Sequence, residues 1–295
     1  MKAALIGYGY WGKILEKYIA SCRDFELVSI CKITPPPVSN LADVLANDEI
    51  NAVFVCTPSR THYEICKKLL RSGKHVFCEK PLVMNPGEAE KLYEFASVSG
   101  KILYADYIYT VSASIQDCKE ILKQLGKLIC IEGEISQFGR FYSGETAADI
   151  IGVHLFSVLG LWFPEDEASN INVIINSGEV MLMSCEIRGI KILLKCNLLC
   201  PGQKVRRFDI FGENGRLSID LSGNEWTLRL QNFTRTGAGE YKFIDEIKEF
   251  HDERNNIDKA ISEFAECIKT GSVKANRDIA FKTDKLLMKL RRMNN

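Results

Sequence analysis

Three glycines near the start of the chain, Gly7, Gly9 and Gly12, have the spacing that a dinucleotide pyrophosphate requires. They follow a short apolar run at residues 3–6 and precede a stretch of helical periodicity over residues 11–20. Gly7 permits the tight turn, Gly9 lets the backbone approach the phosphates, and Gly12 lets the helix pack closely on the strand. The phosphates are expected at the helix N-terminus, against its unpaired N–H groups. A purely structural turn is the alternative.

Two more polar residues follow predicted strands. Thr57 comes after the apolar run at residues 50–56, and Lys80 lies in a Glu-Lys-Pro sequence after the run at residues 75–78. In open α/β sheets, ligands bind outside the carboxyl ends of the strands. We therefore expect Gly7, Thr57 and Lys80 to converge on one crevice.

Lys32 stands near the end of the second predicted strand, residues 25–32. In NAD-binding domains an acidic residue there binds the ribose hydroxyls of the adenosine. A cation suits a 2′-phosphate instead, so Lys32 favours NADP, although a solvated lysine at a strand end explains the residue equally well.

The elements that position these residues alternate between strand and helix up to about residue 110. Strands are predicted at residues 3–6, 25–32, 50–56, 75–78 and 101–107, and helices at residues 11–20, 41–46, 57–73 and 88–97. This alternation predicts a doubly wound parallel sheet. Three consecutive prolines in the segment 34–40 interrupt regular structure after the second strand.

The pattern changes after residue 110. Helices are predicted at residues 112–124, 147–162, 257–269 and 278–293, and strand-like runs at residues 127–136, 171–177, 180–187, 191–199, 206–212, 216–221 and 226–231. Consecutive alternating strands predict a mostly antiparallel sheet. We therefore expect a Rossmann domain over residues 1–110 and a substrate-binding and oligomerisation α/β domain over residues 111–295.

Composition limits the partners. The chain has 295 residues, and its 38 basic residues balance 38 acidic ones, so nothing attracts it globally to nucleic acid or to anionic membranes. No apolar run approaches the ~18 residues of a membrane span, and no basic helix-turn-helix segment is present, so we expect a cytoplasmic protein that binds neither membrane nor nucleic acid. The eleven cysteines are an odd number and several lie in apolar stretches, which favours buried thiols over disulfides. No metal site is predicted, because the Cys196–Cys200 pair has no second pair at zinc-site spacing.

Three segments resemble the glucose–fructose oxidoreductase/inositol dehydrogenase (Gfo/Idh/MocA) family, and the resemblance covers nearly the whole chain. They are GYGYWG at the start, CTPSRTHYEICKKLLRSGKHVFCEKPL in the middle and EFAECIKTG near the end. The resemblance implies a Rossmann domain followed by an α/β domain with an open antiparallel sheet, and an NAD(P)-dependent oxidoreductase. The GYGYWGK segment is closest to members of sugar and nucleotide-sugar metabolism, which implies a small sugar or nucleotide-sugar substrate. The second domain's sheet often mediates family contacts, so a homodimer or homotetramer is expected.

The resemblance also assigns residues. It implies that the cofactor is bound by the glycine turn, by the end of the second strand, by the Thr-Pro turn with its histidine, and by the Glu-Lys-Pro sequence. These residues are Gly7, Tyr8, Gly9, Tyr10, Trp11, Gly12, Lys32, Cys56, Thr57, Pro58, His62, Glu79 and Lys80. Lys80 is placed between the nicotinamide ribose and the substrate hydroxyl, where its ammonium can hold the reacting oxygen.

His154 is the implied general acid/base, because an imidazole with a pKa near neutrality can take the alcohol proton as hydride leaves. The family places an aspartate four residues earlier on the same helix, but here Ile150 stands in that position and Asp149 lies five residues before His154. On an ideal helix, four residues set side chains about 40° apart and five set them about 140° apart. Asp149 can therefore partner His154 only if the helix starts late or distorts. A satisfied histidine on an apolar helix is the alternative.

Two other departures concern the substrate and adenosine sides. The connection between the second and third strands is shorter than the family norm. Asp106 and Tyr107 lie where family members often place substrate-facing polar residues. One alternative is that either residue replaces the missing acid, and the other is that both cap the domain junction. Arg140 and Tyr142 fall near the expected substrate cleft and suit phosphate or sugar contacts, or else are solvated loop residues.

Three functions fit these residues. The first is hydride transfer between nicotinamide and a hydroxyl or keto carbon of a sugar, in either direction. The second is a transient oxidation by tightly held NAD that assists an elimination. The third is a non-catalytic dinucleotide-binding regulator or assembly partner, which the displaced Asp149 keeps open.

Overall fold

The computed structural model describes residues 1–32, 40–85, 87–222, 226–250 and 255–293. The proline-rich connection predicted to lack regular structure therefore lies almost entirely outside the described residues. The chain forms two compact units, which are described one at a time. The first contains residues 1–111 and 254–288, and the second contains residues 112–253 and 289–295. The boundary expected after residue 110 is one residue away, whereas residues 254–288 group with the first unit instead of the second.

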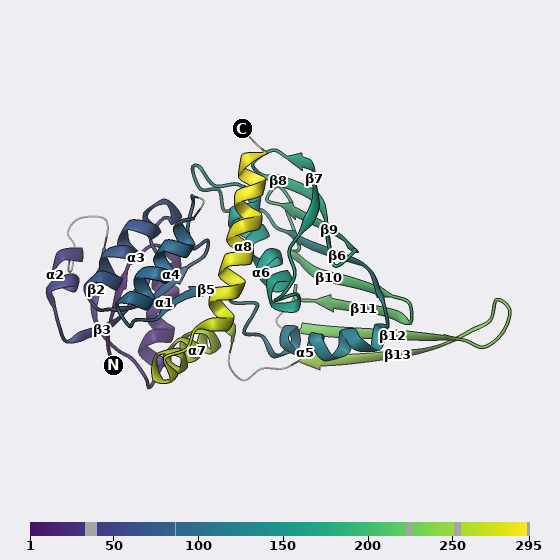
Figure 1. Cartoon of the computed structure of the whole chain (residues 1–295), viewed down its shortest axis with the longest axis horizontal. Coiled ribbons are helices and arrows are strands. Elements are labelled where there is room, and N and C mark those ends of the chain that lie inside the picture. Colours follow the sequence, from purple (N-terminus) through teal and green to yellow (C-terminus); the bar gives the residue numbers. More distant parts are fainter. Residues whose placement is uncertain (33–39, 86, 223–225, 251–254, 294–295) are drawn as a thin grey trace. The chain divides into compact units, whose positions relative to one another are not determined.

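The first unit is built on a five-stranded sheet in the order β2-β1-β3-β4-β5, and each neighbouring pair is parallel (Figure 1). Its strands are β1 (Lys2–Ile6), β2 (Glu26–Cys31), β3 (Ile50–Val55), β4 (His75–Glu79) and β5 (Leu103–Asp106). Its helices are α1 (Tyr10–Ser21), α2 (Leu41–Ala46), the 3₁₀ turn η1 (Ser59–Thr61), α3 (His62–Arg71), α4 (Glu88–Val98), α7 (Asn256–Thr270) and most of α8 (Lys274–Arg292). The predicted doubly wound parallel sheet is confirmed.

An aromatic cluster forms the core of this unit. Phe54, Phe77 and Tyr104 are register partners on β3, β4 and β5, and each contacts Phe264 of α7 with ring centroids 5.6–6.0 Å apart. Aromatic pairs in such edge-on and tilted geometries contribute beyond their buried area. Because side chains alternate along a strand, the positions two residues further along this face are Glu79 and Asp106. The aromatic core therefore ends where the polar edge of the sheet begins.

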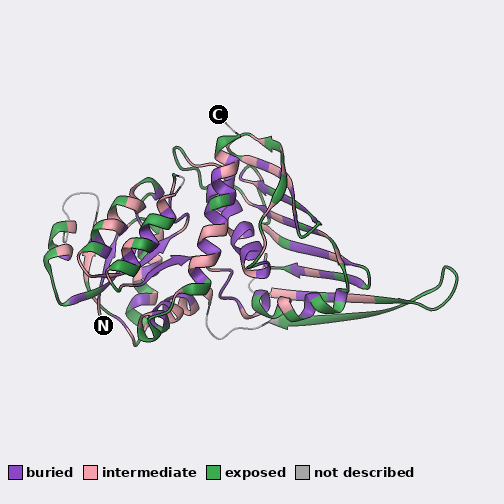
Figure 2. Ribbon diagram, viewed as in Figure 1, coloured by how far each residue is buried: buried purple, intermediate pink, exposed green. Residues whose placement is uncertain are grey.

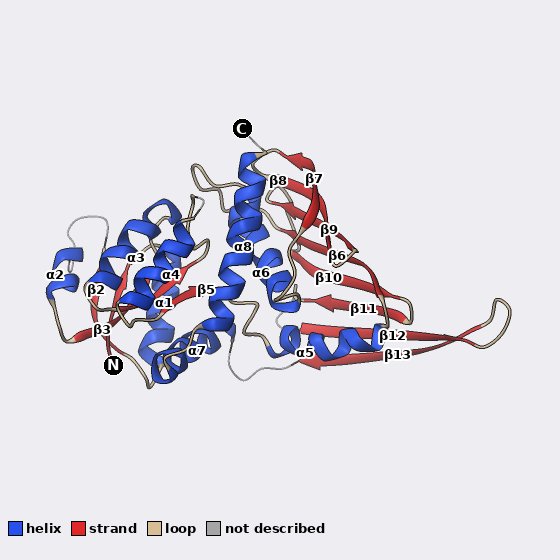
Figure 3. Cartoon of the chain, viewed as in Figure 1, coloured by secondary structure: helices blue, strands red, loops and turns tan. Residues whose placement is uncertain are grey.

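The second unit is built on an eight-stranded sheet in the order β13-β12-β11-β10-β6-β9-β8-β7, which is antiparallel except for the parallel β6–β9 pair (Figure 3). Its strands are β6 (Leu128–Ser136), β7 (Ser169–Asn176), β8 (Val180–Ile187), β9 (Ile190–Asn197), β10 (Val205–Gly212), β11 (Gly215–Asp220), β12 (Trp226–Arg235) and β13 (Tyr241–Phe250). Its helical segments are α5 (Ala113–Leu122), the 3₁₀ turn η2 (Lys123–Leu125), the π-helical turn η3 (Ala148–Gly152) and α6 (Val153–Trp162). The predicted, mostly antiparallel sheet is confirmed.

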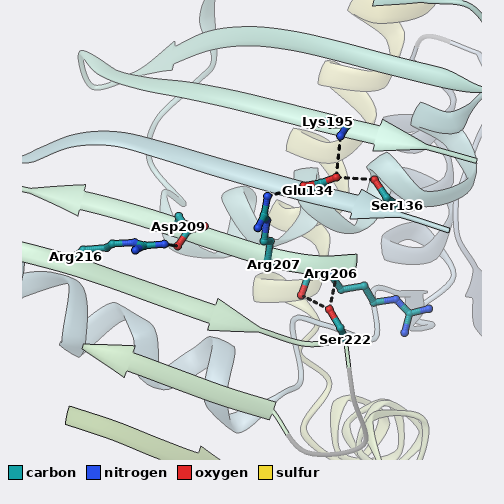
Figure 4. A network of polar contacts seen from close by, with 8 residues as sticks. All are labelled: Glu134, Ser136, Lys195, Arg206, Arg207, Asp209, Arg216 and Ser222. Carbon is teal, nitrogen blue, oxygen red and sulfur yellow. Dashed lines mark hydrogen bonds and ion pairs between the residues drawn. The ribbon is translucent and has the colours of Figure 1, made fainter. Parts of the chain in front are cut away.

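The two faces of this sheet differ. One face is apolar and buried, with Trp162 of α6 packing on Phe208 of β10 at a centroid distance of 5.1 Å. The opposite face carries a polar network, in which Glu134 binds Lys195 at 3.0 Å and Arg207 at 2.9 Å (Figure 4). Alternating inward and outward positions along each strand produce this division.

Strand β13 was not predicted from the sequence. It pairs with β12 over the whole length from Trp226 opposite Phe250 to Arg235 opposite Tyr241. Its described side chains are all exposed, and Figure 2 shows the β12–β13 ribbon continuing beyond the neighbouring strands as an exposed arm. Because neither face of β13 is buried, its sequence carries no alternation of apolar and polar residues that would indicate a strand.

All eleven cysteines are free thiols, of which seven are buried and four are partly buried. Among the described residues, no helix is both long and apolar enough to cross a membrane. The same residues contain no cluster of three histidine, cysteine or acidic side chains that would hold a metal ion.

Candidate functional site

The glycine turn after β1 is packed too tightly for any side chain at two of its three glycines. Gly7 has φ +96°, and a Cβ there would lie 2.5 Å from the carbonyl oxygen of Cys56. A Cβ at Gly12 would lie 2.2 Å from the carbonyl oxygen of Gly7. Gly9, in contrast, has no heavy atom within 4 Å of the position that its Cβ would take. The turn thus packs directly on its own strand and helix at Gly7 and Gly12 and leaves free space at Gly9, as a phosphate-binding turn must do.

The N-terminus of α1 fits an anion. Gly9 is its N-cap and offers no side-chain cap, and the first turn contains no acidic residue. Its leading N–H groups and the positive end of the helix dipole therefore point to the open side of the turn. These residues fit the pyrophosphate of a dinucleotide.

A cationic site lies beside this turn. The ammonium of Lys32, which directly follows β2, lies 4.9 Å from the centroid of the Tyr8 ring. Lys13 lies 6.0 Å from the same ring. The Tyr8 hydroxyl donates to Glu16 at 2.5 Å, and this hydrogen bond raises the pKa of Tyr8. A cation held over an aromatic face gains electrostatic attraction, so Lys32 has a defined place next to the glycine turn.

The loops after β3 and β4 are tied together by His62. Its ring is buried, 1% exposed, and its two nitrogens lie 2.8 Å from the carbonyl oxygen of Thr57 and 2.9 Å from that of Pro81. Thr57 also accepts a hydrogen bond from Thr61 at 2.7 Å. The predicted cofactor residue His62 thus contacts the backbone of two loops at the carboxyl edge, and Pro58 beside it is exposed.

Two carboxyl groups lie side by side at the ends of β4 and β5. Glu79 and Asp106 are register partners and are 7% and 1% exposed. Burial, with the nearby Asp106 charge, raises the pKa of Glu79 well above its usual range, and burial raises the pKa of Asp106 to about 7. Lys80, which is half-buried, follows Glu79 directly and lowers both values through its charge.

The end of β5 is held by Asn276 of α8. Its side chain accepts from the Ala105 N–H at 2.9 Å and donates to the Ala105 carbonyl at 2.8 Å. These two bonds take the place of the backbone hydrogen bonds that a further strand would make at this edge of the sheet. They hold Ala105, the residue before Asp106, in position. Tyr107, the other predicted polar residue here, is buried and follows the end of the strand.

In the second unit, His154 lies in the first turn of α6, directly after the π-helical turn η3. The Val153 N–H donates to the carbonyl of Ala148, five residues earlier, so the helix is wider here than an α-helix. In this hydrogen-bond pattern, residues five apart are one turn apart. The distortion that would allow Asp149 to partner His154 is therefore present, and π-turns of this kind are frequent at functional sites.

The carboxylate of Asp149 is 2% exposed and has several donors. Oδ2 accepts from the backbone N–H of Thr146 at 2.9 Å and from its hydroxyl at 2.8 Å. Oδ1 accepts from Nε of Arg291 at 3.0 Å and also from its Nη2. Asp149 thus caps the start of the helical segment and pairs with the C-terminal end of α8.

The two remaining predicted substrate residues lie in the same unit, in the loop between β6 and η3. Arg140 and Tyr142 are both exposed there, and the Tyr142 carbonyl accepts from the Glu145 N–H at 3.1 Å. The structure therefore brings together the cofactor residues predicted in the first unit at the carboxyl edge of one sheet. Asp149, His154, Arg140 and Tyr142 belong to the second unit.

Two residues of these sites were missed by sequence reasoning. Arg291 and Asn276 lie far along the chain from their partners, and no local pattern points to them. The Glu79–Asp106 pairing has a weak signal, because the consecutive predicted strands over residues 75–78 and 101–107 each have an acid next to their end.

Comparisons with known proteins agree with this architecture. Residues 1–107 match the Gfo/Idh/MocA family model, described as an oxidoreductase family with an NAD-binding Rossmann fold. D-glucoside 3-dehydrogenase of Escherichia coli K12 is 30% identical over 134 residues, which are 41% of this chain and 38% of that protein. Human biliverdin reductase A is 30% identical over 69 residues, 23% of each chain. The chain thus aligns with less than half the length of these curated relatives.

Solved structures extend the likeness to the whole chain. KijD10, a 3-ketoreductase from Actinomadura kijaniata solved with TDP-benzene and NADP, superposes with a TM-score of 0.80 at 18% identity, over 96% of both chains. An NAD-binding protein from Listeria innocua superposes with a TM-score of 0.79 at 15% identity, over 97% of this chain and 94% of that one. At these identities the likeness establishes the fold. The match over residues 1–107 makes the first unit similar to the NAD-binding Rossmann domain of the Gfo/Idh/MocA oxidoreductase family.

Proposed function

We propose that this protein is an NAD(P)-dependent oxidoreductase that transfers a hydride between nicotinamide and a hydroxyl or keto carbon of a sugar or nucleotide-sugar. The observation that carries the proposal is the glycine turn, which is closed at Gly7 and Gly12 and open at Gly9, on the same sheet edge as Lys80. A dinucleotide site and a half-buried lysine at the carboxyl ends of one parallel sheet are the parts that such a reaction needs.

Each residue has a distinct task in this proposal. The bound cofactor supplies the hydride acceptor or donor. The Lys80 ammonium holds the substrate oxygen and stabilises the negative charge that develops on it. The His154 imidazole takes the alcohol proton in the oxidative direction and returns it in the reductive one. Asp149 supports His154 indirectly, by capping the turn that precedes it.

The substrate class rests on relatives and on the second unit. One relative acts on D-glucosides and one structural neighbour is a 3-ketoreductase solved with a TDP compound, which supports a sugar or nucleotide-sugar substrate. The exposed Arg140 and Tyr142 are proposed to contact its hydroxyls or phosphates, because guanidinium and phenol groups suit both.

The cofactor is proposed to be NADP(H). Lys32 is held over the Tyr8 ring beside the glycine turn, with Lys13 near the same ring, so that positive charge gathers where a 2′-phosphate would bind. Binding of NAD⁺, NADH, NADP⁺ and NADPH, measured by calorimetry, tests this. Tighter binding of the phosphorylated pair supports it, tighter binding of NAD(H) removes the Lys32 argument, and no binding removes the function.

A non-catalytic dinucleotide-binding protein is the second candidate. The observation that favours it is the engagement of Asp149 by Thr146 and Arg291, which occupies the acid next to His154.

The first prediction separates the two candidates. Lys80→Ala and His154→Ala should each lower kcat by about 100-fold or more on a turned-over sugar while nucleotide affinity changes by only a few-fold. Lys91→Ala, on the exposed side of α4, is the control. Wild-type turnover in both variants would contradict the mechanism.

A further inference from the structure

Two carboxyl groups at the sheet edge have no task in the hydride transfer proposed above. Glu79 and Asp106 are buried register partners at the ends of β4 and β5, close enough for each carboxyl group to affect the pKa of the other. Among the described residues, neither Oε1 of Glu79 nor either oxygen of Asp106 receives a bond from an amide, hydroxyl or cationic donor. Oε2 of Glu79 accepts from the backbone N–H of Lys80 at 3.3 Å. The pair is therefore a buried carboxyl dyad, in which three of the four oxygens have no donor within the described part of the chain.

A hydrogen bond between two carboxyl groups requires at least one proton, because an ionised carboxylate is only an acceptor. Two negative charges on neighbouring buried carboxyl groups would also repel each other strongly. The dyad therefore holds either one proton and one negative charge, or two protons and no charge.

The neighbours of the dyad are a cation and neutral groups. The Lys80 ammonium, at the end of β4, favours ionisation of both acids. The thiol of Cys56, just after β3, donates to the Gly7 carbonyl at 3.4 Å, and burial keeps its pKa far above neutral. Burial also raises the pKa of the Cys78 thiol, which lies next to Glu79 on β4, and the pKa of Tyr104 on β5. The Tyr104 hydroxyl donates to Glu263 of α7 at 3.2 Å.

The dyad also lies where a ligand is expected. It ends β4 and β5 at the carboxyl edge of the sheet, and Cys56 on the next strand contacts the glycine turn. Oxidised nicotinamide carries a positive ring charge that reduced nicotinamide lacks. A negative dyad at this edge attracts the first and not the second.

We propose that the Glu79–Asp106 dyad releases a proton when an oxidised, cationic nicotinamide binds at this edge, so that the site selects the oxidised cofactor more strongly as pH rises. This inference rests on the proposed function, since it needs a bound nicotinamide. The step balances: the doubly protonated dyad and NAD(P)⁺ give the singly protonated dyad with bound NAD(P)⁺ and one proton in solution. Reduced cofactor binds without this release.

The proton affinities support the proposal at neutral pH. Because burial raises the pKa of Asp106 to about 7, the neutral and negative dyads coexist there, while Glu79 keeps its proton. A nearby positive charge lowers the pKa of Asp106, so Asp106 loses its proton in those molecules that still hold it. At pH 7 this amounts to about half a proton per chain.

Calorimetry in two buffers of different ionisation enthalpy measures this release. NADP⁺ and NADPH are compared, because both carry the same 2′-phosphate and differ in ring charge. The wild type should release about half a proton more with NADP⁺ than with NADPH at pH 7. Asp106→Asn should abolish the difference. Glu79→Gln should keep it, because the glutamine amide can donate to the Asp106 carboxylate in place of the acid.

Each result decides a separate statement. Equal release with the two cofactors in the wild type, or an undiminished difference in Asp106→Asn, overturns the dyad and leaves the proposed function standing. No binding of either cofactor overturns the proposed function and the inference with it. If Asp106→Asn does not fold, the pH dependence of the wild-type Kd ratio decides. A midpoint near pH 7, with up to about a tenfold change per unit below it, supports the dyad, and a midpoint about two units away overturns it.

Discussion

At the scale of single residues, Lys32 shows how an aromatic ring gives a flexible cation a defined place. Its ammonium lies over Tyr8 at 4.9 Å, and the Tyr8 hydroxyl is itself bound to Glu16. The lysine is therefore positioned beside the glycine turn before any ligand arrives. Such preorganisation reduces the entropy lost when a charged group binds.

Lys32→Asp should reverse the proposed cofactor preference. An acid at the end of β2 accepts hydrogen bonds from ribose hydroxyls and repels a 2′-phosphate, so the ratio of NADPH to NADH affinity should fall by about 100-fold. Fluorescence titration with both reduced cofactors measures the ratio. Lys17→Asp, an exposed position on α1, is the control. An unchanged ratio would show that Lys32 does not select the cofactor.

Asp106 should make the protein less stable as pH rises. Its pKa is raised in the folded state from 3.8 to about 7, so between these values the folded chain binds more protons than the unfolded one. The free energy of unfolding therefore falls from about pH 4 to about pH 7 and is independent of this group above. Asp106→Asn should raise the free energy of unfolding at pH 8 by up to about 4 kcal/mol and remove the part of the slope that this group contributes.

Urea unfolding at pH 5 and pH 8 tests this stability prediction. The comparison of interest is the gain that Asp106→Asn produces at each pH, which should be larger at pH 8. A variant that is equally or less stable than the wild type at pH 8 would show that the buried acid is compensated by its surroundings.

At the scale of elements, the helical segment with Asp149 and His154 holds the main departure from the sequence pattern. The spacing of five residues does not fit an α-helix, and the π-helical turn accommodates it. An apolar periodicity over residues 147–162 predicts the helix but not its extra residue, because a π-turn depends on tertiary contacts. Arg291 supplies such a contact from α8, whose position no local pattern reveals.

Arg291→Met should destabilise this segment. It leaves the Asp149 carboxylate buried without its guanidinium, at a cost of about 3 kcal/mol in the free energy of unfolding. If Asp149 acts by positioning His154, kcat should fall and its pH profile should shift, since a displaced imidazole has new neighbours. Arg292→Met, at an exposed position of the same helix end, is the control.

Adding Asp149→Asn to Arg291→Met should recover part of the lost stability, whereas purely additive effects would show that the pair is not coupled.

Most elements could be predicted from the sequence, because their apolar residues recur at the period of the element they form. The parallel sheet follows from buried runs such as residues 50–55, and the glycine turn from its spacing. β13 could not be predicted, because it is stabilised by pairing with β12 and buries no face. The dyad needs the register of β4 against β5, which periodicity does not contain.

At the scale of the whole molecule, the expected homo-oligomer concerns the second unit. Its sheet has a polar network on the face opposite α6, and the exposed β12–β13 arm carries apolar side chains, including Phe243 and Ile247 on one face of β13. Exposed apolar strands of this kind tend to pair with other chains unless they are protected.

Light scattering of the full chain should therefore give the mass of a dimer or larger assembly. Phe243→Asp with Ile247→Asp should shift that mass towards the monomer and leave nucleotide binding unchanged, since the first unit does not contain β13. Val98→Asp, an exposed apolar position on α4, is the matched control. A monomeric wild type would contradict the homo-oligomer.

The return of residues 254–288 to the first unit affects the order in which the protein can be completed. The ribosome releases β1 to β5 early, but Phe264, which contacts the aromatic cluster, and Asn276, which fixes the end of β5, emerge only after the entire eight-stranded sheet. The nascent first unit therefore has an uncovered aromatic face while the eight-stranded sheet is translated. The synthesis of this unit therefore starts before the eight-stranded sheet and is completed only after it.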